Sequence, residues 1–373
     1  MPIAFYSQDT HYSIIKMMRV LGIKSFFEEG TAKFSGDCPI TSDGKWPQEV
    51  PSVQGLLGPG SIDPGKLKVL VEFFASRGYP ILISLNYGTT FKGAYDDVRA
   101  AIEPLIDVLK RCGLFERKVF FDPDRPERFD LRNGFWVHVD GALGAAFMPF
   151  IEIAHRRGLI AERGPDFDFR LPYVHSLCVS GHKWIGAPWP CGVYMTKVKY
   201  QLRPPDDPEY IGSPDTTFAG SRNGFSAIIL WNYLAKTSHD TQVEKALAAE
   251  RIAAYAEDQL LQLQERLQVD LWIARTPLSL TVRFRAANHD LVRKYSLSGE
   301  TMAVGSENHA YNHIFAMEHV TRERIDALIT DLAQAGSLLP NNPSPLTPAH
   351  ASVVTSEIAG VLIHVPHAGH GFR

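Results

Sequence analysis

Runs of apolar residues with strand-like composition alternate with segments of helical periodicity over residues 1–200. The candidate strands are residues 3–6, 80–86, 135–139, 175–179 and 192–195. The candidate helices are residues 12–21, with Asp9-Thr10 as possible cap, 64–76, with Asp63 as N-cap before Pro64, and 95–109. This alternation predicts an α/β fold with a mostly parallel sheet covered by helices on both faces.

The polar segments that follow three of these strands are residues 86–90, 140–142 and 180–183. Loops beyond the carboxyl ends of parallel strands carry the chemistry of such sheets, so these segments are the first places to look for a site.

The pattern changes after residue 240. Residues 242–267 read as one long amphipathic helix, followed by a strand near 279–284 and a helix near 322–334. We therefore expect a large domain over residues 1–240 and a smaller α+β domain over 241–336. A Pro/Asn/Ser-rich linker and a loosely attached tail make up residues 337–373. The tail's His364, His367 and His370 could suggest a metal, but an exposed tail is the favoured interpretation.

Composition narrows the class of protein. Apolar residues make up 45% and charged residues 21% of the chain, as in ordinary globular proteins. A formal charge of −3 argues against nucleic acid as a partner, and no apolar run approaches the ~20 residues that cross a bilayer. Four widely separated cysteines and an N-terminus unlike a secretory signal predict a cytoplasmic location.

The strongest local signal is Ser180-Gly181-His182-Lys183-Trp184, directly after a candidate strand. A confined lysine with a lowered pKa can lose its proton and attack an aldehyde, so Lys183 suits a Schiff base. Ser180 and His182 can donate hydrogen bonds to a phosphate. A surface turn with a solvated Lys183 is the alternative, and spacing alone favours it.

A second signal is Asp140, which ends the strand containing His138. A carboxylate at the end of a buried strand needs a cation or hydrogen-bond donors, and a protonated pyridine nitrogen would meet that need. A helix N-cap is one alternative. A metal pair with His138, which shares its strand face, is another, although no third ligand is apparent.

A third signal is His11, in Ser7-Gln8-Asp9-Thr10-His11, just before a candidate helix. A histidine there can lie flat on a cofactor ring in its neutral form. An ordinary hydrogen-bonded histidine is the alternative that a single residue favours.

Taken in order, these motifs resemble the group II pyridoxal phosphate (PLP) dependent amino acid decarboxylases, in particular the histidine/serine/valine decarboxylase subfamily. The resemblance runs from about residue 3 to about residue 333. The blocks that carry it are YSQDTHYSIIK, NYGTTFKGAYDDV, HVDGALGAAFMPF, SGHKWIGAPWPCGVYMTK and GSRNGFSAIILW.

The resemblance implies a role for each matching residue. Lys183 would form the Schiff base with PLP, Asp140 would pair with the pyridine nitrogen, and His11 would stack on the ring. Other residues implied around the cofactor are Thr90, Ala142, Ser180 and His182.

The resemblance also implies that Tyr210, helped by His182, protonates the substrate carbon. Ser221 would touch the substrate from the neighbouring subunit of a homodimer; without the family it would be a helix N-cap for the run near Ser226. The implied reaction converts an L-amino acid, histidine first and then valine, leucine or serine, into its amine and carbon dioxide. Transamination and decarboxylation-dependent oxidative deamination on the same scaffold remain alternatives.

One departure from the family stands out. Relatives carry a Gly-Thr-Glu-Gly-Asn block, before the part matched here, whose amides wrap the PLP phosphate, and neither Gly-Thr-Glu nor Glu-Gly-Asn occurs in this chain. We therefore expect an N-terminally incomplete large domain. A catalytically impaired homologue acting as a partner subunit is the alternative function. Residues 36–60, rich in Gly and Pro, are expected to form a solvent loop.

Overall fold

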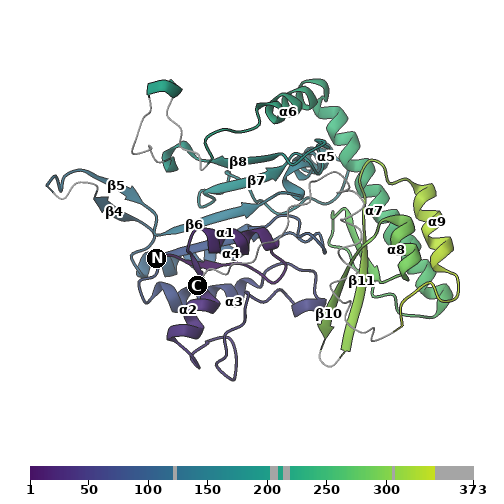
Figure 1. Ribbon diagram of the computed structural model, residues 1–373, viewed down its shortest axis with the longest axis horizontal. Coiled ribbons are helices and arrows are strands. Elements are labelled where there is room, and N and C mark those ends of the chain that lie inside the picture. Colours follow the sequence, from purple (N-terminus) through teal and green to yellow (C-terminus); the bar gives the residue numbers. More distant parts are fainter. Residues whose placement is uncertain (121–123, 202–208, 213–218, 305–306, 341–373) are drawn as a thin grey trace, which may run out of the picture.

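A mixed six-stranded sheet dominates the computed structural model, which describes residues 1–120, 124–201, 209–212, 219–304 and 307–340 (Figure 1). Its strand order is β2-β1-β3-β6-β7-β8, parallel except for the edge strand β8. The strands are β1 (Ile3–Phe5), β2 (Lys24–Ser25), β3 (Ile81–Asn86), β6 (Phe135–Asp140), β7 (Ser176–Ser180) and β8 (Gly192–Thr196). The predicted α/β fold with a mostly parallel sheet is confirmed.

The handedness of the connections decides which helix covers which face. Right-handed crossovers from β2 to β3, β3 to β6 and β6 to β7 all advance in one direction, whereas the crossover from β1 to β2 runs the other way. The first three place their helices on one face, and the last places α1 on the opposite face. The helices concerned are α1 (Tyr12–Val20), α2 (Phe26–Lys33), α3 (Pro64–Ala75), α4 (Val98–Arg111) and α5 (Met148–Arg156).

The face under α3, α4 and α5 is the main core of the large domain. Its strand residues are almost fully buried and join one cluster with Leu70, Phe74 and Leu105 of the helices. Each large apolar side chain removed from water there stabilises the fold by roughly 1.5–3 kcal/mol. The strand residues of this face are Ile3, Phe5, Ile81, Ile83, Leu85, Val137 and Val139.

A second sheet forms the C-terminal unit, which lies beside the long helix α7 in Figure 1. Its antiparallel strand order is β10-β11-β9. The elements are α7 (His239–Leu267), β9 (Thr281–Arg285), α8 (His289–Tyr295), β10 (Ser298–Val304), β11 (Glu307–Phe315) and α9 (Arg322–Leu332). The predicted division at residue 240 falls in the first turn of α7 and stays a prediction, and the tail beyond residue 340 lies outside the described residues.

Two further elements project from this body. The hairpin of β4 (Arg117–Phe120) and β5 (Phe129–Arg132) extends away from the sheet in Figure 1. Helix α6 (Gly224–Lys236) lies at the opposite end of β8 from the hairpin and leads into α7.

Several predicted boundaries need correction. His11, not Asp9 or Thr10, caps α1, because the side chains of Asp9 and Thr10 are committed to Ser52, Ser7 and Asn86. Helix α4 starts at Val98 rather than residue 95, after Asp97 as N-cap. Asp63 does cap α3 as predicted.

Residues 36–60 are only in part the solvent loop that their composition suggested, since exposed residues such as Lys45 and Leu57 alternate with buried ones. Trp46 and Val50 are buried in the main core, and the Trp46 indole N–H donates to the Phe34 carbonyl oxygen at 2.8 Å. An aromatic anchor therefore holds a segment whose Gly and Pro content had indicated exposure.

No helix of the described ranges is long and apolar enough to span a bilayer. Within the same ranges, no group of three or more His, Cys, Asp or Glu side chains is placed to hold a metal ion. His364, His367 and His370 lie outside them. The four cysteines are free thiols, and the cytoplasmic location expected from them stays a prediction.

Candidate active site

Three adjacent parallel strands end at one edge of the sheet and bring the predicted segments together. Asn86 of β3 lies in register with Asp140 of β6, and Asp140 lies in register with Cys178 of β7. The segments 86–90, 140–142 and 180–183 therefore leave neighbouring strands at the same edge.

Asp140 is fixed at this edge by two donors. Its Oδ1 accepts the Ala142 backbone N–H at 3.0 Å and the Cys178 thiol at 3.3 Å. Burial and the neighbouring Asp140 carboxylate raise the pKa of Cys178 to about 12, so the thiol stays protonated and acts as a donor. Two donors therefore fix the position of the Asp140 carboxylate.

The Lys183 loop follows β7 and is held by backbone contacts. The Ser180 N–H donates to the Ala142 carbonyl at 3.2 Å, and the Gly181 N–H donates to the Cys191 carbonyl at 2.7 Å. The His182 Nδ1 lies 3.0 Å from both the Cys191 nitrogen and its carbonyl oxygen. Ser180, His182 and Lys183 thus sit on a turn tied to the strands on either side.

His11 completes the group from the start of α1. Its Nδ1 lies 2.7 Å from the Ser13 Oγ, which fixes the ring at the helix N-terminus. Burial lowers the His11 pKa first, the Lys183 charge lowers it further, and the Asp140 carboxylate opposes both. His11 is therefore a neutral imidazole within electrostatic range of Lys183 and Asp140.

A buried polar network holds the turn before His11. Asp96 accepts hydrogen bonds at 2.6 Å from the backbone N–H groups of Ile62 and Asn86. The Asn86 Nδ2 lies 3.1 Å from the hydroxyls of Ser7 and Thr10. Burial raises the Asp96 pKa to about 7 against the lowering effect of these donors.

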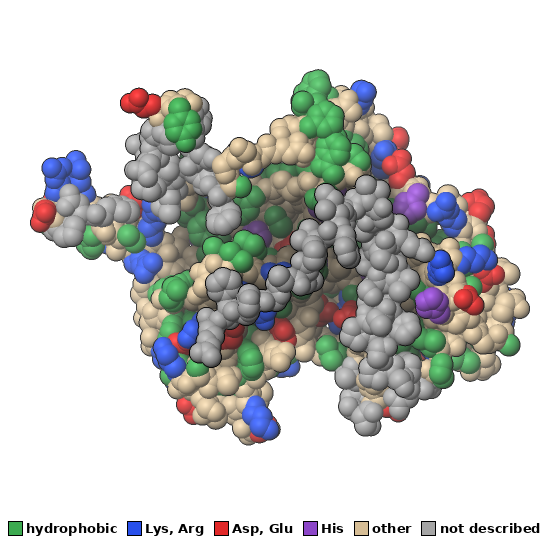
Figure 2. All heavy atoms as spheres, viewed as in Figure 1, with side chains coloured by type: hydrophobic (Ala, Val, Ile, Leu, Met, Phe, Trp, Pro, Cys, Tyr) green, Lys and Arg blue, Asp and Glu red, His purple; other side chains and the backbone are tan. Residues whose placement is uncertain are grey.

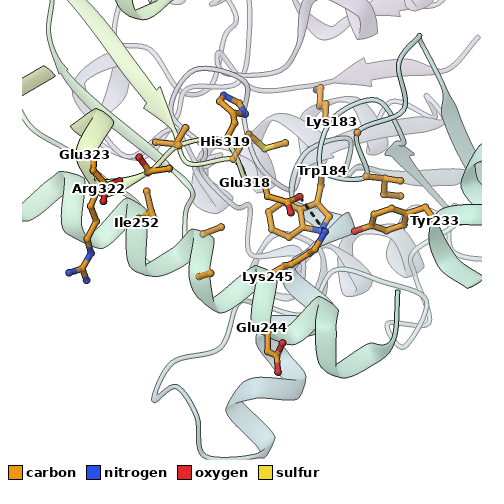
Figure 3. A pocket seen from close by; sticks show the side chains of 17 residues that line it. Lys183, Trp184, Tyr233, Glu244, Lys245, Ile252, Glu318, His319, Arg322 and Glu323 are labelled. Atoms are coloured by element: carbon orange, nitrogen blue, oxygen red, sulfur yellow. Dashed lines mark hydrogen bonds and ion pairs between the residues drawn. The ribbon is translucent and has the colours of Figure 1, made fainter. Parts of the chain in front are cut away.

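Two cavities border this edge. A cavity of about 900 Å³ lies against the Lys183 loop, and Figure 3 shows Trp184 in it, with Tyr233 and Lys245 nearby and Lys183 at its rim. His11 and Asp140 do not line it. A smaller cavity of about 340 Å³ lies under α1 on the face of Asp140, and reaches Cys178, His138 and Tyr194.

Three of the predicted site residues are exposed to solvent. Tyr210, in the 3-10 turn Glu209–Ile211, is 90% exposed. Ser221 and Thr90 are also exposed. Ser221 is not the cap of α6, because Asn223 caps that helix and accepts the Phe225 N–H.

His138 shares the strand face of Asp140, as the sequence predicted, but it is engaged elsewhere. Its Nδ1 lies 2.8 Å from the Ser176 hydroxyl, and its ring stacks near Tyr194. Burial lowers the pKa of His138, so the ring is a neutral partner of Ser176.

Cys178 and Asp96 were missed by sequence reasoning, whereas Asn86 begins one of the segments that it singled out. Cys178 meets Asp140 only because β6 and β7 are neighbours in this register, which a single sequence does not give. For Asp96 a signal existed, since a second acid beside the N-cap Asp97 has no capping role of its own.

The side chains at this edge fit PLP by their chemistry. A lysine amine can hold an aldehyde, a donor-fixed carboxylate can keep a ring nitrogen protonated, and a neutral imidazole can face an aromatic ring. An α/β sheet with these three groups at its carboxyl edge is the arrangement expected of a PLP-dependent enzyme.

Residues 58–260 match the model of the pyridoxal-dependent decarboxylase conserved domain, and the chain belongs to that family. It is 29% identical over 332 residues to the histidine decarboxylase of Solanum lycopersicum, covering 88% of this chain and 62% of the relative. Serine decarboxylase 2 of Oryza sativa subsp. japonica is 28% identical over 333 residues, with 89% and 56% covered. These similarities confirm the group II histidine/serine decarboxylase subfamily.

Among solved structures, L-methionine decarboxylase from Streptomyces sp. 590 superimposes with a TM-score of 0.83 at 47% identity, covering 89% of this chain and 70% of that enzyme. The chain thus spans between 56% and 62% of the two curated relatives, and more of this bacterial enzyme.

Proposed function

We propose that this chain catalyses PLP-dependent decarboxylation of an L-amino acid to its amine and carbon dioxide. The convergence of Lys183, Asp140 and His11 at one edge of the sheet carries the proposal. Family membership supports it, because the curated relatives are amino acid decarboxylases.

Bound PLP supplies an aldehyde for the substrate amine and a ring that accepts the electron pair released when the carboxylate leaves as carbon dioxide. Lys183 would hold the cofactor through its side-chain amine. Asp140, whose Oδ1 is held by the Ala142 N–H and the Cys178 thiol, would pair with the ring nitrogen and hold a proton there.

The remaining residues would orient the cofactor and protonate the substrate. His11, kept neutral by burial and by the Lys183 charge, offers a flat face to the ring without adding a second cation. Ser180 and His182 would hold the phosphate, with Thr90 and Ala142 beside the cofactor. Tyr210, with help from His182, is the proposed proton donor to the substrate α carbon, and its exposure leaves the side chain free of packing contacts that would hold it in another role.

For the substrate we favour an amino acid with an apolar side chain such as methionine. The identity to the L-methionine decarboxylase is 47%, against 29% to the tomato histidine decarboxylase. Histidine, which the sequence motifs favoured, is the second candidate, followed by valine, leucine and serine.

Amine release from these five amino acids, with PLP added, tests the proposal. We expect methionine to react fastest, and Lys183→Ala to lower every rate at least about 1000-fold. A native chain that binds PLP but releases no amine from any of them would favour the alternative of a catalytically impaired partner subunit.

The homodimer is part of the proposal and draws support from α6. Phe225, Ile228, Trp231 and Leu234 recur at intervals of three residues, and each is more than half exposed. Figure 2 shows this apolar surface over α6. Ser221, just before α6, would reach the substrate of the second subunit. We expect Trp231→Glu to produce monomers in sedimentation velocity, and a native monomer would contradict the dimer.

A further inference from the structure

The turn that delivers His11 is anchored at its corner residue, Asp9. The turn is closed by the Thr10 N–H donating to the Ser7 carbonyl at 3.0 Å. The Ser52 hydroxyl donates to one Asp9 carboxylate oxygen at 2.6 Å, and the Lys92 Nζ lies 2.9 Å from the other. Asp9 stands two residues before His11, so whatever fixes Asp9 constrains where His11 begins α1.

Lys92 is an unusual partner because its side chain is only 3% exposed, and that of Asp9 is 11% exposed. A Cβ atom at Gly60 would lie 2.8 Å from the Lys92 Cδ, so the backbone closes over the lysine stem. Burying two charges is expensive, and hydrophobic residues of similar size would pack as well. The buried ion pair of Asp9 and Lys92 is therefore not explained by stability alone.

The loop that carries Lys92 is clamped by the C-terminal unit. The Phe91 ring stacks on His313 of β11 at 4.7 Å, and the His313 Nδ1–H donates to the Phe91 carbonyl at 2.8 Å. Gly93 lies so close to Ser279 and Thr281 that no side chain would fit there. Thr90 belongs to the same loop, two residues before Lys92.

Two charged side chains of the C-terminal unit interact with the Asp9–Lys92 pair. Arg283 of β9 interacts electrostatically with Asp9 and with Glu300 of β10, and Glu300 interacts in turn with Asp9 and Lys92. The Arg283 Nη2 also donates to the Leu57 carbonyl at 2.8 Å. Two positive and two negative side chains thus meet where the two units join.

We infer that Asp9 and Lys92 are a positioning pair, which sets the placement of His11 and couples it to the C-terminal unit through the clamped loop. The inference rests on the proposed function only in assigning His11 to the cofactor ring. The proposed reaction assigns no step to Asp9 or Lys92.

The test removes both charges together, because a single change would leave a buried charge unpaired and could unfold the chain. In the double variant Asp9→Asn with Lys92→Met, the asparagine keeps an acceptor for Ser52 and methionine keeps most of the lysine volume. The matched control is Glu29→Gln, since the Glu29 side chain is 4% exposed and pairs with Lys24 and Lys33 away from the site.

The first readout needs no cofactor. Hydrogen exchange of the Thr10 and Ile14 amides, which close the turn and the first helical turn, should be at least about tenfold faster in the double variant than in the native chain. Glu29→Gln should leave both amides unchanged. Native exchange rates at Thr10 and Ile14 in a folded double variant would overturn the inference.

The second readout is the dissociation constant of pyridoxal 5′-phosphate and the circular dichroism per bound cofactor. We expect the double variant and His11→Ala each to weaken binding about tenfold, the scale of one lost ring contact, and to change the dichroism alike. Adding His11→Ala to the double variant should cause no further loss. Additive losses would overturn the inference, whereas a native chain that binds no cofactor would overturn the proposed function and leave the exchange result to decide this one.

Discussion

The two faces of the central sheet are built from alternate residues of the same strands, yet they differ in polarity toward the carboxyl ends of the strands. On the face under α3, α4 and α5, Phe5, Ile83 and Val137 are fully buried and apolar. On the face under α1, the strands present serine, asparagine, histidine, aspartate and cysteine beside an apolar cavity of about 340 Å³. One face holds the strands in place, and the other uses that rigidity to hold reactive groups.

The difference shows why the site stands at a strand end. Asp140 follows Val139, which is fully buried on the other face, so the carboxylate inherits the rigidity of the core. Catalytic groups mounted on rigid elements keep their geometry without reorganisation. Changes on the buried face should therefore lower stability, and changes on the α1 face should lower activity.

The largest expected effect is on the buried face. Phe5 stacks on Phe26 at 5.5 Å and contacts Phe74 edge-on at 5.9 Å, so Phe5→Ala removes a ring that fills the space beside both. The cavity left by Phe5→Ala lies between the two remaining rings, and we expect the free energy of unfolding to fall by about 3–5 kcal/mol, measured by urea denaturation. A loss below about 1 kcal/mol would break the comparison, because the core would not depend on this face.

Next comes Asp140→Asn on the α1 face. Asparagine keeps an oxygen for the Ala142 N–H but loses the charge that holds a proton at the ring nitrogen. We expect the decarboxylation rate to fall about 100- to 1000-fold while the urea midpoint changes little. Comparable losses in stability and rate would show that the two faces are not separable.

The third prediction concerns the pH dependence of stability that His175, just before β7, should cause. His175, just before β7, accepts the Val137 N–H, and burial lowers its pKa to about 4 from 6.5. Between these values the unfolded chain binds a proton that the folded chain refuses, so stability falls as the pH drops from 6.5 toward 4. The slope from this group is about 1.4 kcal/mol per pH unit.

The measurement is urea unfolding of the native chain and His175→Gln at several pH values. The difference between the two slopes isolates His175 from other buried histidines, such as His138 and His313, whose pKa values are also lowered. Identical slopes would mean that His175 is not buried in its neutral form.

The smallest expected effect is at Cys178. Cys178→Ala removes a weak thiol donor to Asp140, and we expect a roughly threefold lower rate. Cys178→Ser keeps a hydroxyl donor and should stay within about twofold of the native rate. A larger loss in the serine variant than in the alanine variant would exclude a donor role for this position.

Much of the fold could be predicted because the period of the apolar residues changes between strands and helices. The strand 135–139 was found at Phe135–Asp140, and the long helix 242–267 was found at His239–Leu267. The burial of Trp46 and Val50 within residues 36–60 could not be predicted, since it depends on contacts with the distant core.

The candidate site, like the fold, could be predicted where local motifs indicate it and not where distant contacts form it. The positions of Lys183, Asp140 and His11 followed from motifs next to strand ends and a helix start. The contact of Cys178 with Asp140 and that of Lys92 with Asp9 depend on strand order and on a junction between units, which no local pattern encodes.

One measurement decides whether the edge of the sheet is a cofactor site at all. The chain is incubated with pyridoxal 5′-phosphate, treated with borohydride, and digested for mass spectrometry. Our account predicts one pyridoxyl group fixed on the peptide that contains Lys183, and none on that peptide in Lys183→Ala. A label spread over exposed lysines such as Lys45, with Lys183 unmodified, would contradict it.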